Sequence, residues 1–406
     1  MYHRYIFDFD QPEIASGHSK DQAAHLAVPC KPCKLVAYLN LDGSKPMRFD
    51  EKSVDCANNP LRGRRAFLAG ALLPVLAGCR STPQFVDAAG RPLEGSLAAM
   101  ERVVINGVEQ SVWLRGRSVR NPILLILHGG PGASESALLR HFNTDLEQDY
   151  LVCYWEQRGT GRSWRPQLDA ASMSIAQILD DLDRLVDLLL RRFGEDKVVL
   201  LGHSWGTVLG VLYSQRHPAK VARYIGVAQV VNVVAAQEAE LAFALEQARQ
   251  RRDDRAITAL AGLGNPPFGV DAALELEGWT ARFGGLFAGG LDKGDLIMAA
   301  LRASEANLLD LALFGLGNRF SLRALWREYL QVALDKTVPR LGVPVLLVLG
   351  RHDRHVSSEL AARWFASLQA PGKRLVWFEQ SGHNPPFEEP ARFNALLREV
   401  ARHGAG

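Results

Sequence analysis

The chain has 406 residues, of which 47% are hydrophobic and 22% charged, and its formal net charge at pH 7 is +3. This size and composition indicate a globular protein with a full hydrophobic core, arranged as one large domain with an insertion. Lys and Arg (47) nearly balance Asp and Glu (44), which excludes the strong excess of basic residues expected of a nucleic-acid-binding protein.

An export signal is predicted ahead of the globular part. Arg64-Arg65-Ala66-Phe67-Leu68 opens a short apolar run that ends in Leu76-Ala77-Gly78-Cys79. The run is shorter than the ~20 residues that span a bilayer. The arginine pair resembles a twin-arginine signal, and the last four residues resemble a bacterial lipoprotein cleavage site, at which Cys79 would be acylated and become the N-terminus.

This interpretation divides the first part of the chain. Residues 47–78 are the expected signal, with Met47 as the natural start, and residues 1–46 are an upstream extension. The protein is then exported and lipid-anchored on the periplasmic side of the inner or outer membrane, with no other membrane contact. The alternative is a cytoplasmic protein in which the apolar run is a buried helix. Only Cys153 lies beyond Cys79, so we expect a buried thiol and no intramolecular disulfide.

Short strands alternate with amphipathic helices from residue 97 onward. Residues 97–114 predict two antiparallel edge strands, and apolar runs at 123–127, 197–201 and 343–349 predict buried strands. This alternation favours a mostly parallel sheet covered by helices on both faces. The helix after Ser174 shows the pattern best, with an apolar stripe of Ile175, Ile178, Leu179, Leu182, Leu185, Val186 and Leu189, and with Asp180, Asp181, Asp183 and Arg184 off the stripe.

Gly202-His203-Ser204-Trp205-Gly206 follows one buried strand and precedes an apolar segment at 207–216. A G-x-S-x-G motif between a strand and a helix is typical of a nucleophile elbow, where a sharp turn exposes the serine hydroxyl and glycines avoid collisions. The motif therefore predicts Ser204 as a nucleophile.

A glycine-rich loop, His128-Gly129-Gly130-Pro131-Gly132, follows the strand at 123–127. Acyl transfer needs N–H donors aimed at the oxygen that becomes negative in the tetrahedral intermediate. We assign this role to the N–H groups of Gly130 and Trp205. The alternative is a turn that only reverses the chain.

Two further residues follow buried strands near the C-terminus. Asp353 comes after the strand at 343–349, and His383 lies in a loop after a helix at 359–368 and a strand at 374–378. Asp353 is the candidate orienting acid and His383 the candidate general base, because the order Ser, Asp, His is expected when an α/β-hydrolase sheet carries a catalytic triad. His203 and His352 are less favoured candidates for the base.

Residues 232–337 predict a helical cap. They lie between a strand at about 221–231 and the strand at 343, and an insertion of this length is too long for a loop. The core would then comprise residues 79–231 and 338–406. The cap would cover the elbow and select the substrate. Acidic cap residues are candidate ligands for a substrate amine, with a solvated helix face as the alternative: Glu238, Glu240, Glu275, Glu277 and Glu305.

Together with Glu156-Gln157-Arg158-Gly159-Thr160-Gly161-Arg162-Ser163, the two glycine motifs resemble the proline iminopeptidase family of α/β-hydrolases. The resemblance covers residues 97–401 and implies the α/β-hydrolase fold, with Ser204, Asp353 and His383 as the triad and Gly130 and Trp205 as oxyanion donors. It also implies release of N-terminal residues, often proline, from small peptides. That family usually has aspartate where this chain has Glu156.

Three functions are consistent with the sequence. The first is a serine aminopeptidase acting on short peptides through an acyl-enzyme, which needs acidic cap residues to receive the ammonium group. The second is an esterase, lactonase or amidase for small apolar acyl substrates. The third is a lipoprotein that uses the fold only for binding. The triad chemistry requires neither a metal ion nor an organic cofactor.

Overall fold

The computed structural model describes residues 82–402 of the 406-residue chain. The predicted upstream extension at 1–46, the export signal at 47–78 and the acylation site Cys79 lie outside the described residues. Within the described range, no helix is long and apolar enough to cross a membrane.

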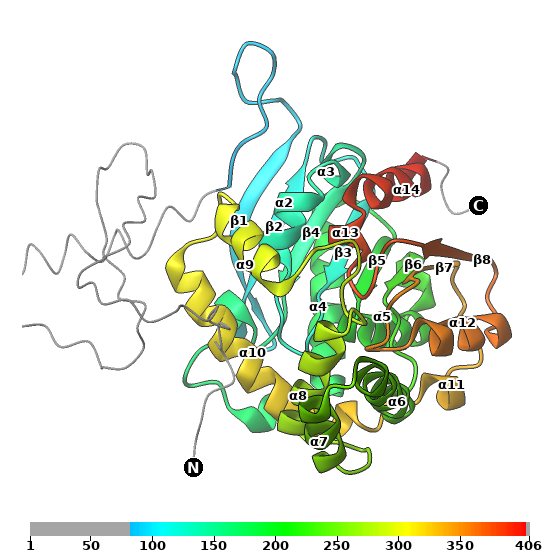
Figure 1. Ribbon diagram of the computed structural model, residues 1–406. Coiled ribbons are helices and arrows are strands. Elements are labelled where there is room, and N and C mark those ends of the chain that lie inside the picture. The colour runs from blue at the N-terminus through cyan, green and yellow to red at the C-terminus, as the bar shows by residue number, and fades with distance from the viewer. Residues whose placement is uncertain (1–81, 403–406) are drawn as a thin grey trace, which may run out of the picture. The chain divides into compact units, whose positions relative to one another are not determined.

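The described chain is built around an eight-stranded sheet (Figure 1). The strands are β1 (Leu97–Ile105), β2 (Val108–Gly116), β3 (Ile123–Leu127), β4 (Leu151–Glu156), β5 (Val198–His203), β6 (Val221–Val227), β7 (Val345–Gly350) and β8 (Lys373–Phe378). Their order across the sheet is β1-β2-β4-β3-β5-β6-β7-β8. The pairs β1/β2 and β2/β4 are antiparallel and all other neighbours are parallel, which confirms the predicted mostly parallel sheet.

Helices cover both faces of the sheet, as predicted. On one face lie α4 (Ile175–Phe193), α5 (Trp205–Arg216) and α12 (Ser358–Ser367); on the other lie α2 (Ser136–Phe142), α3 (Leu146–Asp149), α13 (Pro385–Glu388) and α14 (Pro390–Arg402). Successive side chains of β3 alternate between the two cores, as a strand buried on both faces requires. Three single-turn 3₁₀ helices complete the described core: η1 (Gly161–Ser163), η2 (Ala170–Ser172) and η3 (Pro218–Lys220).

The bounds of α4 follow from its sequence. The Ser174 side chain accepts a hydrogen bond from the N–H of Gln177 at 3.0 Å, and Gly194 ends the helix in the left-handed region at φ 71°. The prediction that Asp181 lies off the buried stripe is wrong. Asp181 is fully buried, and its carboxylate accepts hydrogen bonds from Nε and Nη2 of Arg158 at 2.7 and 2.9 Å, which neutralise its charge.

Between β6 and β7 the chain forms helices in the stretch predicted as a cap. They are α6 (Val233–Arg251), α7 (Asp254–Gly262), α8 (Val270–Arg282), α9 (Lys293–Arg302), α10 (Leu308–Tyr329) and α11 (Leu334–Thr337). The prediction that the preceding strand extends to residue 231 is wrong, because β6 ends at Val227 and Ala228 turns the chain with φ 49°. Helices α6, α7 and α8 share a small core of their own that includes Ala244, Leu260 and Leu276.

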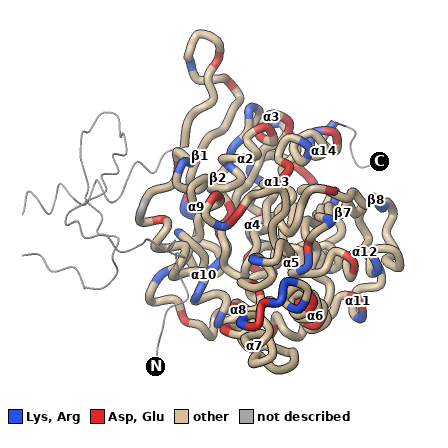
Figure 2. Tube along the Cα trace, viewed as in Figure 1, with Lys and Arg blue, Asp and Glu red and all other residues tan. Residues whose placement is uncertain are grey.

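Helix α10 joins this helical stretch to the loops at the carboxyl edge of the sheet. Asn318 donates a hydrogen bond from Nδ2 to the carbonyl oxygen of Pro131 at 3.1 Å, and Ser321 donates from Oγ to that of Gly159 at 2.9 Å. Figure 2 shows basic and acidic residues interspersed along the described trace, in keeping with their near balance in the sequence.

Candidate active site

Ser204 lies in the turn between β5 and α5. Its φ of 50° and ψ of −119° belong to a sparsely populated region, which costs about 1–3 kcal/mol and persists only where the surroundings impose it. Gly206 makes the turn possible, because a Cβ there would lie 1.9 Å from the carbonyl oxygen of Leu127. Ser204 therefore has the strained strand-to-helix geometry that a nucleophile elbow requires.

The two candidate oxyanion donors lie in the segments that flank this serine. Gly130 has φ 115°, and a Cβ there would lie 2.4 Å from the nitrogen of Gly132, so glycine is required. Trp205 is the first residue of α5, where backbone N–H groups lack a partner within the helix. A Cβ on Gly129 would lie 3.4 Å from the Cβ of Ser204, which shows how closely the glycine-rich loop approaches the elbow.

Gln157 connects the same two segments. Its N–H donates to Nε2 of His128 at 3.2 Å, and its Oε1 accepts from the indole N–H of Trp205 at 3.0 Å. Since Nε2 of His128 accepts, its proton lies on Nδ1, which donates to the carbonyl oxygen of Gly129 at 2.9 Å. Burial lowers the pKa of His128, in keeping with this neutral form.

Glu156 stands where the proline iminopeptidase family, which the motifs resemble, usually has aspartate. Its side chain is buried beside Gln157. Its carboxylate accepts from Oγ of Ser134 at 3.0 Å and from the N–H of Arg162 at 2.8 Å. This residue therefore ties the loop after β3 to the loop after β4.

His383 and Asp353 form a buried pair at the carboxyl edge of the sheet. Nδ1 of His383 donates to Oδ2 of Asp353 at 2.9 Å, and Oδ1 of Asp353 accepts from the N–H groups of His355 and Val356 at 3.0 and 3.2 Å. Burial disfavours the carboxylate, but the charge and hydrogen bond of His383 outweigh it and keep the pKa of Asp353 below its usual value. An imidazole held this way presents Nε2 as a proton acceptor.

The pKa of His383 is also lowered. Burial disfavours the charged ring more than Asp353 favours it, and the charges of His355 and His203 lower the pKa further. The ring is therefore neutral at neutral pH, the form that a general base needs. Among the described contacts, Ser204 Oγ has no hydrogen bond to His383; such contacts are often loose without substrate.

The two less favoured base candidates differ from His383. His203 uses both ring nitrogens: Nδ1 lies 2.6 Å from Oε1 of Glu135, and Nε2 lies 2.9 Å from the carbonyl oxygen of His383. It therefore has no free nitrogen to accept a proton. His352 is exposed.

Two of the five candidate amine ligands gather beside His383. Nδ1 of His355 donates to Oε1 of buried Glu240 at 2.9 Å, and the rings of His355 and His383 meet edge to face at 5.1 Å between centroids. Glu277 accepts from Nζ of Lys293 at 2.7 Å. Burial raises the pKa of Glu277, but Lys293, His355 and His383 outweigh that effect and lower it. Glu240 is thus joined to the candidate base through His355, and Glu277 is near enough for the charged forms of both histidines to affect its pKa.

The other three acidic candidates do not join this group. Glu238 and Glu275 are exposed on α6 and α8. Glu305 is buried between α9 and α10, where it accepts from Oγ1 of Thr82 at 2.6 Å and from Nε of Arg140 at 2.8 Å. Its partners belong to a separate polar cluster.

His355 is positively charged at neutral pH. Burial disfavours the charged ring, but Glu240, with Glu277 and Asp353, more than offsets burial and raises the pKa of His355 to about 9. Sequence reasoning missed His355, Glu135 and Gln157. The available signal was position alone, since His355 follows Asp353 by two residues, Glu135 follows the glycine-rich loop, and Gln157 lies in the second motif.

No group of three or more His, Cys, Asp and Glu residues within 82–402 could hold a metal ion. Cys153 is fully buried in β4, as predicted, and burial raises the pKa of its thiol. A thiol in this state packs like a small apolar side chain.

Comparison with known proteins identifies the family. The model of the alpha/beta hydrolase fold matches residues 122–390. A probable aminopeptidase of Bacillus subtilis, YbaC, is 32% identical over 325 residues, which cover 77% of this chain and 99% of that protein. The chain therefore belongs to the alpha/beta hydrolase family, and it is a hydrolase with aminopeptidase-like relatives.

Proline iminopeptidases also match, over shorter or more divergent stretches. That of Neisseria meningitidis is 31% identical over 118 residues, which cover 29% of this chain and 36% of that protein. The crystal structure of the Mycobacterium smegmatis proline iminopeptidase superimposes with a TM-score of 0.54 at 16% identity, covering 75% of this chain and 98% of that one. At that identity the likeness shows the fold alone, and it confirms the predicted α/β-hydrolase architecture.

Proposed function

We propose that the protein is a serine aminopeptidase that releases N-terminal residues, including proline, from short peptides. The observation that carries this proposal is the hydrogen bond of Glu240 of the helical insertion to His355, next to the paired His383 and Asp353, with Glu277 near enough for both histidines to lower its pKa. The substrate amine would bind at this acidic group while Ser204 attacks the neighbouring carbonyl.

In the proposed reaction, His383 takes the proton of Ser204 as Oγ attacks the carbonyl carbon. The N–H groups of Gly130 and Trp205 stabilise the oxyanion, and Asp353 holds the charged imidazole. The departing amine takes the proton from His383 and leaves an acyl-enzyme on Ser204. Water, deprotonated by His383, then attacks this ester and releases the free amino acid.

The position of the acidic group suits an aminopeptidase. In an N-terminal residue the amine is one carbon atom from the carbonyl that the serine attacks, so its ligands must lie close to the catalytic histidine. Glu277 lies near enough to the catalytic histidine for the charged forms of His355 and His383 to lower its pKa. Glu240 meets this condition through His355, whose ring contacts that of His383.

A second candidate is an esterase, lactonase or amidase for small apolar acyl groups. One observation favours it: both carboxylates already have cationic partners, His355 for Glu240 and Lys293 for Glu277. With those partners in place the group carries little net charge, and a neutral substrate meets no unpaired carboxylate.

Hydrolysis assays with the purified full chain separate the two functions. Proline and alanine arylamides are compared with short p-nitrophenyl esters, with Ser204→Ala as the control for contaminating activity. We expect arylamide turnover that disappears in Ser204→Ala and when the substrate amine is acetylated. Ester turnover alone would refute the aminopeptidase, and no labelling of folded protein by a fluorophosphonate probe would refute both candidates.

A further inference from the structure

Large apolar side chains are exposed on two neighbouring helices of the insertion. Nine large hydrophobic residues of the described chain are exposed, and six of them, at 37% to 51%, lie on α9 and α10: Ile297, Met298, Leu301, Leu309, Phe314 and Leu316. Ile297, Met298 and Leu301 share one side of α9, and Leu309 and Leu316, seven residues apart, share one side of α10, whereas Phe314 lies on another side of that helix. The five residues other than Phe314 are named here the α9–α10 face. Figure 1 shows α9 and α10 following one another along one side of the described chain. Exposed apolar groups of this kind mark interaction surfaces.

Basic side chains accompany the apolar ones. Arg302 is exposed at the end of α9, and Arg319 and Arg323 are exposed on α10, where Arg323 forms an ion pair with Asp271 of α8 at 2.9 Å. Arg319 and Arg323 line a shallow apolar groove with Leu316 and Phe320. Two exposed acidic residues, Asp292 before α9 and Asp295 in its first turn, form the capping box at the opposite end of the helix. Apolar groups flanked by arginine are suited to an anionic lipid surface.

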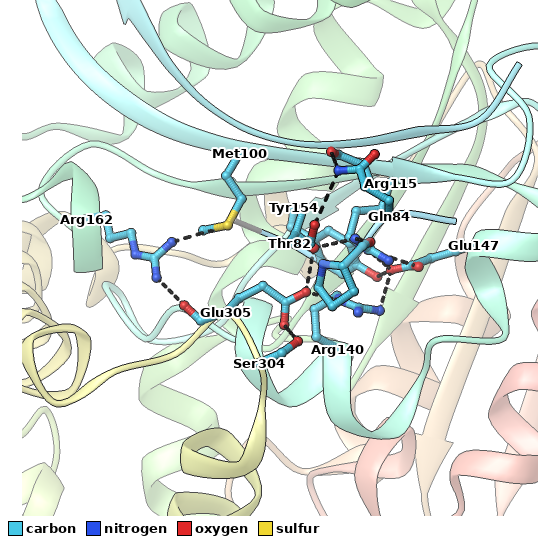
Figure 3. Close-up of polar contacts among 12 residues, drawn as sticks. Thr82, Gln84, Met100, Arg115, Arg140, Glu147, Tyr154, Arg162, Ser304 and Glu305 are labelled. Atoms are coloured by element: carbon cyan, nitrogen blue, oxygen red, sulfur yellow. Dashed lines mark hydrogen bonds and ion pairs between the residues drawn. The ribbon is translucent and has the colours of Figure 1, made fainter. Parts of the chain in front are cut away.

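The described chain begins beside this face. Thr82 is 4% exposed, and its Oγ1 donates to Oε1 of Glu305, between α9 and α10, at 2.6 Å (Figure 3). Arg115 donates from Nη1 to Thr82 Oγ1 and to the carbonyl oxygen of Pro83. Arg140 also donates to Glu305. The start of the described chain is therefore fixed by buried charge-assisted hydrogen bonds rather than by one exposed contact.

Cys79 precedes Thr82 by only three residues. Three extended residues span at most about 11 Å. An acyl chain on Cys79 would therefore hold the turn between α9 and α10 within roughly that distance of the membrane surface.

We propose that the α9–α10 face lies on a phospholipid bilayer, with acylated Cys79 as its tether. The proposal rests on the predicted acylation, which lies outside the described residues. One consequence is that α10 contacts the membrane on its outer side while Asn318 and Ser321 hold the loops after β3 and β4 on its inner side. The substrate would then enter beneath a membrane-bound helix.

Photo-crosslinking tests the proposed contact between the α9–α10 face and the bilayer. It uses the full acylated chain in vesicles of equimolar phosphatidylethanolamine and phosphatidylglycerol. A benzophenone amino acid is introduced at Leu301 of α9, at Leu316 of α10, or at the exposed Arg363 of α12, which Figure 1 shows at the other edge of the sheet. We expect lipid adducts about tenfold more abundant at Leu301 and Leu316 than at Arg363, because bilayer lipid would surround only those two positions. Circular dichroism and fluorophosphonate labelling check that each variant is folded.

Three results would overturn the proposal: equal adducts at all positions, no lipid adduct at Leu301 and Leu316, or adducts of these positions to a second copy of the chain. The last would identify the face as a self-association surface. Because the readout needs no turnover, failure of the aminopeptidase assay and failure of membrane docking are distinguishable.

Discussion

Nε2 of His203 lies 2.9 Å from the backbone carbonyl oxygen of His383. The residue before the elbow serine thus holds the loop that carries the candidate base. Its other nitrogen donates to Glu135 at 2.6 Å. Burial disfavours a charged His203, but the charge and hydrogen bond of Glu135 outweigh burial and raise its pKa. A protonated ring donates from both nitrogens, as its two acceptors require.

We therefore predict that His203→Gln slows the reaction of Ser204 with a fluorophosphonate about tenfold or more, because displacing a catalytic group by about 1 Å can cost up to a hundredfold. Glu135→Gln, which keeps the shape but removes the charge, should have a smaller effect. The labelling rates are measured by stopping the reaction at successive times and quantifying the fluorescence of the bound probe on a gel. Wild-type rates in folded His203→Gln would show that this hydrogen bond does not position His383.

Asp353→Asn tests the acid of the proposed triad. An asparagine at this place would favour the wrong tautomer of His383, so we expect the labelling rate to fall on the order of 10³-fold or more. Thermal unfolding of the variant provides the control for folding. A loss of less than about tenfold would exclude Asp353 as the residue that orients a catalytic base.

The pKa of His383 predicts the acid limb of the pH profile. His383 must be neutral to accept a proton, so activity is present above its pKa and lost as the pH falls through it. Burial, together with the charges of His355 and His203, lowers that pKa, so the midpoint should lie below the usual value of about 6.5. His355→Gln removes one of these charges and should move the midpoint upward. An unchanged or lower midpoint in this variant would contradict the proposed influence of His355.

The fold could be predicted because its signals are local. Each strand is a short apolar run, and the stretches that carry Ser204, Asp353 and His383 follow such runs within a few residues. Parallel strands then bring those stretches to one edge of the sheet. The side-chain partners were not predictable in this way. Glu135 and His203 are 68 residues apart, and Glu240 and His355 are 115 apart, so their contacts depend on tertiary packing.

The five acidic candidates show the same limit. Composition could indicate that the insertion is rich in glutamate, but not which helix face would turn toward His383. On α6, Glu238 is exposed and Glu240 is buried, although they are only two residues apart, because the two side chains point to different sides of the helix. The roles of the site residues themselves stay predictions until they are measured.

Stability should depend on a buried ion cluster at the sheet edge. Oε1 of Glu147 accepts from Nε of Arg115 at 3.0 Å, from Nη1 of Arg140 at 2.8 Å and from the hydroxyl of Tyr154 at 3.0 Å (Figure 3). Glu147→Gln would remove the carboxylate partner of buried Arg115 and leave Arg140 with Glu305 alone, at an expected cost of about 3–5 kcal/mol in the free energy of unfolding. Urea unfolding, followed by tryptophan fluorescence, measures this loss in the free energy of unfolding.

The matched control removes a surface pair. Glu379 and Arg351 form a solvent-exposed ion pair at 2.8 Å, and Glu379→Gln should not change the urea midpoint measurably. Equal midpoints for the two variants would show that the buried cluster contributes no more than a surface pair.

The amine-binding role of the insertion is tested at Glu277. If its carboxylate holds the substrate ammonium, Glu277→Gln should raise KM for a proline arylamide about ten- to a hundredfold, the range expected for a hydrogen bond between charged groups. Turnover of a neutral ester should change little, because an ester places no cation there. Glu275→Gln is the control, since Glu275 lies two residues away on the same helix but is exposed. A KM effect equal for amide and ester would mean that Glu277 supports the shape of the pocket, whereas an effect confined to the free amine would identify the contact that makes this hydrolase an aminopeptidase.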